Sequence, residues 1–164
     1  MLESTSNESI RHIRRLGPDN VDQLLSIFSE IEITGMDTFF KPHPFTAQEA
    51  ERICQYTGKD LYIGGFEGDS MFAYGLLRGW DQGCPNPTLG IYLCQDIRGK
   101  GLGRWFLNQL HRLAASWGSS HVFLTVRREN TRAISLYEKV GYVLENDGPE
   151  HLSGFLNLAD NLFK

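Results

Sequence analysis

A glycine-rich stretch near the middle of the chain has the residue types that bind an anion. It consists of Arg98, Gly99, Lys100, Gly101, Leu102, Gly103 and Arg104. Glycines let backbone N–H groups approach an anion without an intervening Cβ. The start of a following helix adds unpaired N–H donors and the positive end of a dipole. Together with the basic side chains, the stretch predicts a cradle for a pyrophosphate.

Other known phosphate loops fit this stretch poorly. In the P-loop a Ser or Thr follows the Gly-Lys pair, whereas here Lys100 is followed by Gly101. The dinucleotide fingerprint GxGxxG is also missed, because residues 99–103 read GxGxG. A helix start whose glycines serve only close packing is the alternative interpretation.

A second informative segment follows a short apolar strand. Asn130 and Tyr137 lie seven positions apart, which is about two helical turns, so both can face the same edge of a sheet. Alternatively, Asn130 caps the helix and Tyr137 is a packed aromatic residue. A capping role for Asn130 is compatible with a functional one.

These two segments resemble the cofactor motifs of the GNAT superfamily of N-acetyltransferases. Residues 98–103 match its pattern (Gln or Arg)-x-x-Gly-x-(Gly or Ala). A second pattern of the family is matched by Asn130, Ala133, Tyr137, Gly141 and Tyr142. The resemblance implies an α/β fold, a single three-layer α/β/α domain over residues 9–164. Its mixed, mostly antiparallel sheet is expected to splay between the fourth and fifth strands, and its cofactor is expected to be acetyl-CoA.

The resemblance also implies roles for individual residues. An amine attacks the thioester directly, and the Leu93 N–H is expected to stabilise the resulting oxyanion. Tyr137 is expected to act as the general acid toward the leaving thiolate. The residues expected to bind acetyl-CoA are Ile91, Tyr92, Leu93, residues 98–104, Asn130, Ala133 and Tyr137.

The general base is where this chain departs from the family pattern. Some members carry Glu five residues before the motif Asn, where this chain has Thr125, which is not an ordinary base. The candidates that are left are water, His43 and Asp81. A lone histidine between two prolines, as at position 43, more often packs a loop than acts as a base.

Acceptor recognition is expected to come from the N-terminal half of the chain. Phe40, His43 and Phe45 belong to an aromatic segment that either closes over the acceptor or plugs the first helices onto the sheet. Arg78 and Trp80 leave the end of a strand, where they either bind a polar substrate or form an ordinary hairpin end. These segments resemble sugar-modifying acetyltransferases, which favours a small-molecule amine such as an amino sugar. The alternatives are a protein N-terminal or lysine acetyltransferase and a non-catalytic acetyl-CoA-binding domain.

The elements that must position these residues follow from the hydrophobic periodicity. Apolar and alternating runs predict strands at 10–16, 61–67, 71–79, 89–94, 121–126, 142–145 and 152–158. Helical spacing predicts helices at 21–31, from a Thr46 cap onward, at 102–117, and from 130 or 131 to Gly141. The order βααβββαβαββ mixes hairpins with crossovers, which predicts an α/β fold with a mixed sheet.

Composition excludes several classes of protein. The chain has 164 residues, of which 41% are hydrophobic and 22% charged, as expected for one globular domain. Residues 1–8 are polar and are expected to be disordered. The net charge of -4 argues against sequence-independent binding to nucleic acid.

The cysteines and the chain start predict the compartment. The three cysteines form no CxxC pair, so neither a metal site nor a disulfide framework is expected, and a reducing compartment fits best. The polar start does not resemble an export signal, and no apolar run reaches membrane-spanning length. We therefore predict a cytoplasmic protein without a membrane partner. The strand at 152–158 is a candidate for pairing in a homodimer.

Overall fold

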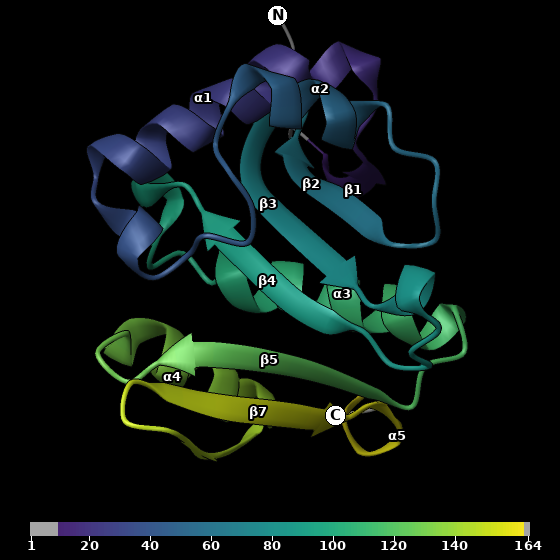
Figure 1. The fold of residues 1–164 in the computed structure, drawn as a ribbon, viewed down its shortest axis with the longest axis vertical. Helices are drawn as coiled ribbons and strands as arrows, with labels where there is room; N and C mark the ends of the chain where they lie inside the picture. The colour runs from purple at the N-terminus through teal and green to yellow at the C-terminus, as the bar shows by residue number, and fades with distance from the viewer. Residues whose placement is uncertain (1–9, 163–164) are drawn as a thin grey trace, which may run out of the picture.

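The computed structural model describes residues 10–162, in which seven strands form one sheet (Figure 1). The strands are β1 (Arg11–Arg15), β2 (Leu61–Glu67), β3 (Ser70–Arg78), β4 (Thr88–Leu93), β5 (His121–Arg127), β6 (Val143–Asp147) and β7 (His151–Asn157). Their order across the sheet is β1-β2-β3-β4-β5-β7-β6. Neighbouring strands are antiparallel except for β4 and β5, which are parallel.

The helices begin and end at residues that favour helix termini. They are α1 (Val21–Ile33), α2 (Ala47–Cys54), α3 (Leu102–Ser116), α4 (Thr131–Val140) and α5 (Leu158–Asn161). The Thr46 hydroxyl accepts a hydrogen bond from the Glu49 N–H (3.1 Å) and so caps α2. Gly141 ends α4 in the left-handed region, with φ 117°.

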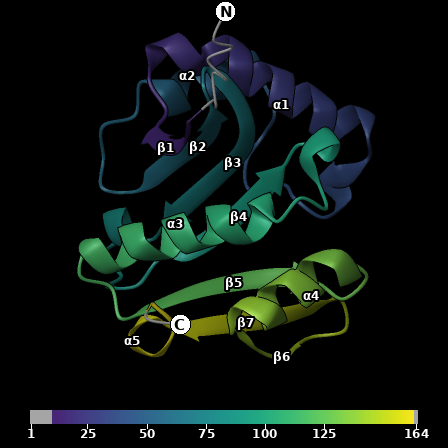
Figure 2. The same ribbon diagram turned by 180° about the vertical axis from the view of Figure 1, so that it is seen from behind.

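The helices cover the sheet on both faces. Leu24, Phe28 and Ile31 of α1 pack in one apolar cluster with Phe66 and Tyr74 of the sheet. The helices α3 and α4 pack in a second cluster on the opposite face (Figure 2). The predicted three-layer α/β/α fold and the order of its elements are therefore confirmed. The short helix α5 was not predicted, and element bounds shift by a few positions.

The sheet opens between β4 and β5. These strands pair at one position, Thr88 with Phe123, where the Phe123 N–H also bonds to the Pro87 carbonyl (2.9 Å). By contrast, β4 pairs with β3 from Thr88 to Leu93. The predicted splay between the fourth and fifth strands is confirmed, and it leaves one edge of β4 without a neighbouring strand. In Figure 1, β4 and β5 are seen to diverge from this point.

Two features of the chain complete the description. The predicted disorder of residues 1–8 falls outside the described residues. Among residues 10–162, no helix has the length and apolar character needed to cross a membrane.

His111 makes stability depend on pH. It lies on the buried face of α3, with its Nε2 hydrogen-bonded to the Tyr142 hydroxyl (2.8 Å). Burial lowers its pKa to about 4, from 6.5 in an exposed histidine. As the pH falls, His111 binds a proton in the unfolded chain before it does so in the folded protein, and this favours unfolding. The contribution of neutral His111 to the free energy of unfolding is therefore complete above pH 6.5 and is lost as the pH falls toward 4.

Acidification from pH 7.5 to pH 5 should lower the free energy of unfolding by about 2 kcal/mol through protonation of His111 in the unfolded chain. Urea unfolding of the wild type and of His111→Gln at both pH values measures this contribution. The variant should lose less stability on acidification than the wild type. Equal losses in the two proteins would contradict the assignment.

Candidate active site

A cavity of about 710 Å³ lies where β4 and β5 diverge. Its walls come from the connection between α1 and α2, from β4, from the glycine-rich loop that starts α3, and from the end of β5 with the start of α4. The lining residues are Met36, Phe39, Phe40, residues 89–93, Ile97, Arg98, Gly99, Gly101, Gly103, Arg104, Thr125, Val126, residues 129–133, Ser135, Leu136, Tyr137 and Lys139. The two sequence motifs therefore meet in one place. Of the residues predicted to bind acetyl-CoA, Lys100 and Leu102 do not line the cavity.

The glycine-rich loop presents bare backbone to the cavity. Gly99 and Gly101 have φ values of 81° and 77°, which residues with a side chain rarely adopt. Gly101 is the N-cap of α3, so the first N–H groups of this helix receive no side-chain cap. Gly103 serves packing instead, because a Cβ there would lie 3.2 Å from Leu93 and Leu136. The packing interpretation therefore holds for Gly103, and anion binding by the backbone at Gly99 and Gly101 stays a prediction.

The free edge of β4 offers backbone groups to the same cavity. The Cys94 N–H bonds to the Phe72 carbonyl of β3 (2.9 Å). Because successive residues of a strand direct their N–H groups to opposite edges, the Leu93 N–H points to the open side. This N–H group is the one predicted from the sequence to stabilise the oxyanion.

Arg98 is turned back onto β4. Its Nε and Nη2 donate to the Leu93 carbonyl at 3.2 and 3.1 Å. Its guanidinium also lies 5.4 Å from the centre of the Tyr92 ring. Arg98 thus ties the start of the glycine-rich loop to the end of β4, while its positive charge stays at the cavity wall.

Asn130 caps α4 and leaves its amide N–H groups open to the cavity. Its Oδ1 accepts a hydrogen bond from the Ala133 N–H (3.3 Å) and caps α4. The same residue lines the cavity, and no hydrogen bond from its Nδ2 is found within residues 10–162. The amide N–H groups can therefore donate to a ligand without loss of the cap.

Tyr137 lies deep in the wall formed by α4. It is 7% exposed, lines the cavity, and packs edge-on against Tyr142 with the ring centres 5.5 Å apart. Burial raises the pKa of its phenol well above 10. The hydroxyl is therefore protonated at neutral pH, which is the state that a proton donor requires.

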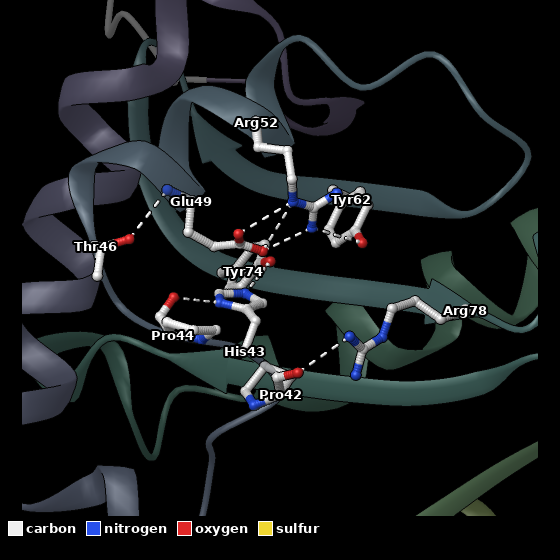
Figure 3. A network of polar contacts seen from close by, with 9 residues as sticks. All are labelled: Pro42, His43, Pro44, Thr46, Glu49, Arg52, Tyr62, Tyr74 and Arg78. Carbon is white, nitrogen blue, oxygen red and sulfur yellow. Dashed lines mark hydrogen bonds and ion pairs between the residues drawn. The ribbon is translucent and has the colours of Figure 1, made fainter.

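His43 lies outside the cavity lining and has both ring nitrogens engaged (Figure 3). Its Nδ1 donates to the Pro44 carbonyl (2.8 Å), so in the neutral ring Nε2 accepts from the Tyr74 hydroxyl (2.8 Å). Burial lowers the pKa of His43. The structure thus gives His43 the loop-packing role, and its ring does not line the cavity in which a base would act.

Four other residues predicted for the acceptor or the base also lie outside the lining: Asp81, Trp80, Arg78 and Phe45. Asp81 accepts the Lys59 N–H (2.8 Å), and the buried Trp80 donates to the Ser119 hydroxyl (3.3 Å). Arg78 donates to the Pro42 carbonyl (3.1 Å). Phe45 packs against Phe28.

Of the three residues in the aromatic segment that were predicted to bind the acceptor, Phe40 lines the cavity. Met36 and Phe39 join it there, although the sequence did not single them out. Met36 belongs to an aperiodic connection between helices, where hydrophobic spacing carries no signal about which side chain faces inward.

Comparisons with known proteins agree with this geometry. The model of the Acetyltransferase (GNAT) family matches residues 28–142. YobR of Bacillus subtilis, an uncharacterized N-acetyltransferase, is 38% identical over 52 residues, which are 32% of this chain and 21% of that protein. This chain thus aligns with about a fifth of the length of YobR.

Solved structures share the fold at low sequence identity. Spermidine N-acetyltransferase from Vibrio cholerae, in complex with CoA and spermine, has a TM-score of 0.75 at 15% identity, covering 94% of this chain and 98% of that one. RimL, a ribosomal L7/L12 alpha-N-protein acetyltransferase in complex with CoA, has a TM-score of 0.77 at 13% identity, covering 90% and 93%. An acetyltransferase of the same family from Streptococcus pneumoniae has a TM-score of 0.73 at 17% identity, covering 90% and 99%.

Proposed function

This chain belongs to the acetyltransferase (GNAT) family, and we propose that it transfers the acetyl group of acetyl-CoA directly to a primary amine of a small molecule. The observation that carries the proposal is the cavity between β4 and β5. In it, the open edge of β4, the uncapped start of α3 and the protonated Tyr137 face the same space.

The residues of the cavity fit acetyl-CoA along its length. The N–H groups at the start of α3, with Arg104 beside them, would hold the pyrophosphate. The free edge of β4 and the Asn130 amide would bind the peptide-like pantetheine arm. Acetyl-CoA supplies the thioester carbonyl and the thiolate leaving group.

The proposed transfer assigns one task to each of two groups. The amine nitrogen forms a bond to the carbonyl carbon while the carbon–sulfur bond breaks, and the amine loses a proton to water. The Leu93 N–H stabilises the negative charge that develops on the carbonyl oxygen. Tyr137 donates its hydroxyl proton to the departing sulfur and then regains a proton from water, which balances the proton that the amine releases.

Ligand-dependent thermal unfolding tests the proposal. Acetyl-CoA at about 100 times its Kd should stabilise the protein by ~2.7 kcal/mol, a rise in Tm of roughly 5–10 °C for a domain of this size. Release of the CoA thiol should then depend on an added amine. Folded protein whose Tm does not change at saturating acetyl-CoA would contradict the proposal, and binding without turnover of any amine would favour a non-catalytic domain.

The cysteines of the protein itself also react in an assay that detects the CoA thiol. Cys84 is exposed, whereas Cys54 and Cys94 are at least partly shielded. Burial raises the pKa of Cys54 to about 11, and burial together with Glu30 raises the pKa of Cys94 to about 12. We expect one fast-reacting thiol per native chain at pH 7.5, which Cys84→Ser removes. Fast labelling that persists in this variant would show that another cysteine is open.

The homodimer and the cytoplasmic location stay predictions. So does the amino-sugar acceptor, with which the acceptor proposed in the next subsection competes. A row of apolar side chains supports the homodimer. Phe123, Phe155 and Val143 are paired across β5, β7 and β6, and Phe123 and Val143 are 42% and 50% exposed. In Figure 1 this half of the sheet has α4 behind it, while α1 and α2 lie over the other half.

A further inference from the structure

The part of the cavity wall that comes from the connection between α1 and α2 is apolar. It is formed by Met36, Phe39 and Phe40, which we call the aromatic wall. Each of these side chains is half-buried. The Phe40 ring lies over Gly90 of β4, where a Cβ would be 3.4 Å from its Cε2 atom. The aromatic wall therefore rests on the strand whose free edge is proposed to hold the acetyl group.

Packing holds Phe40 in place before any ligand binds. Its ring centre lies 6.1 Å from that of Tyr74, 6.0 Å from that of Tyr92 and 6.4 Å from that of Phe45. Contacts of this kind stabilise a fixed ring orientation. The aromatic wall is thus preformed and does not have to order itself around an acceptor.

The chain that follows the aromatic wall is anchored to the sheet, as Figure 3 shows. Arg78 donates to the Pro42 carbonyl (3.1 Å), and the Tyr74 hydroxyl bonds to His43 (2.8 Å). Thr46 then caps α2. His43 and Arg78 lie outside the cavity lining and hold the segment that carries Phe40 in position. They therefore act as positioning residues for Phe40.

The charges around the cavity are unfavourable for a polycation. Within the described lining, Glu129 is the acidic residue, and it is paired with Arg127 (3.5 Å) at the start of α4. The basic residues of the lining are Arg98, Arg104, Arg132 and Lys139. Acetyl-CoA phosphates would offset part of this positive charge, but within the described lining an acceptor with several ammonium groups would find no carboxylate other than Glu129, which is already paired with Arg127.

Resting on the proposed function, we propose that the acceptor is a primary amine carried on an aryl or branched alkyl group that packs against the aromatic wall, and that Phe40 selects it. Apolar surroundings disfavour the ammonium form and lower the pKa of a bound amine. A neutral nucleophile then forms with water as the proton acceptor. This is compatible with Thr125, which is not an ordinary base, at that position of the cavity lining.

A comparison of three amines tests the proposal. The value of kcat/KM is measured for 2-phenylethylamine, glucosamine and spermidine at saturating acetyl-CoA. The wild type should prefer 2-phenylethylamine by at least tenfold. Phe40→Ala should lower kcat/KM for 2-phenylethylamine at least tenfold by raising KM, while the Kd of acetyl-CoA stays unchanged. The kcat/KM of Phe40→Leu should lie between those of Phe40→Ala and the wild type. Ile33→Ala, which removes an exposed apolar side chain outside the lining and outside the apolar row on β5 to β7, is the control and should behave as the wild type.

The outcomes separate this inference from the proposed function. Turnover that favours glucosamine or spermidine, or that is indifferent to Phe40, overturns the inference while the acetyltransferase activity stands. If no amine is turned over, binding of 2-phenylethylamine to the CoA complex is measured by thermal unfolding. Binding that Phe40→Ala abolishes supports the aromatic wall as a subsite and overturns the transfer, and absence of binding overturns both.

Discussion

Tyr137→Phe should lower kcat by about 100-fold or more and leave the Kd of acetyl-CoA nearly unchanged. The change removes the hydroxyl alone, so the ring keeps its packing against Tyr142. What is lost is the proton that the departing sulfur receives. Because burial raises the pKa of Tyr137 well above 10, wild-type kcat should also show no loss from ionisation of this phenol up to pH 10. Single-turnover kinetics and equilibrium binding measure the two quantities separately.

Tyr142→Phe is the matched control for this prediction. Tyr142 is buried next to Tyr137, but its hydroxyl bonds to His111 (2.8 Å) and it does not line the cavity. Loss of that bond should cost about 1–2 kcal/mol of stability and leave kcat within about twofold. Similar losses of kcat in the two variants, or an unchanged kcat in Tyr137→Phe when chemistry limits the rate, would refute the general-acid role.

Gly101→Asp should weaken acetyl-CoA binding by about 100-fold or more, equivalent to ~2.8 kcal/mol. Gly101 occupies the N-cap of α3 with φ 77°. An aspartate there would direct its carboxylate at the same N–H groups that are proposed to hold the pyrophosphate, and would repel the phosphates. Isothermal titration with acetyl-CoA measures the change.

Gly118→Asp separates this effect from backbone strain. Gly118 also has a positive φ of 91°, has open space around a Cβ, and follows the far end of α3 outside the cavity. Both substitutions introduce a left-handed aspartate, which costs roughly 1–2 kcal/mol of stability. We expect Gly118→Asp to lower Tm without changing the Kd of acetyl-CoA. An equal loss of affinity in the two variants would show that strain, not the phosphate site, is responsible.

The elements, and the meeting of the two motifs in one cavity, could be predicted from the sequence because each motif is encoded locally. Apolar residues recur at about every fourth position before residue 61 and at every second position after it, which marks the change from helices to strands. Glycine residues and Asn130 mark the points at which a strand is followed by a helix. The residues of each motif lie within one strand–loop–helix unit. Their placement in space therefore follows once that unit forms.

The acceptor side could not be predicted in the same way because long-range contacts determine it. His43 bonds to Tyr74, and Pro42 to Arg78, across more than thirty positions of the chain. These contacts decide that His43 is an anchor and that Phe40 faces the cavity. A proline-rich aromatic segment has no periodicity from which such a choice can be read. The same reason explains why Met36 and Phe39 were not singled out.

The most direct test of the account follows a labelled acetyl group. Wild type and Tyr137→Phe are incubated with acetyl-CoA that carries a deuterated acetyl group and an equimolar mixture of 2-phenylethylamine, glucosamine and spermidine. Mass spectrometry then identifies the labelled product. We expect the label on the nitrogen of 2-phenylethylamine with the wild type and only a trace with the variant. Acetyl-CoA that stays intact with every amine, although it binds, would contradict the central claim that this cavity transfers an acetyl group.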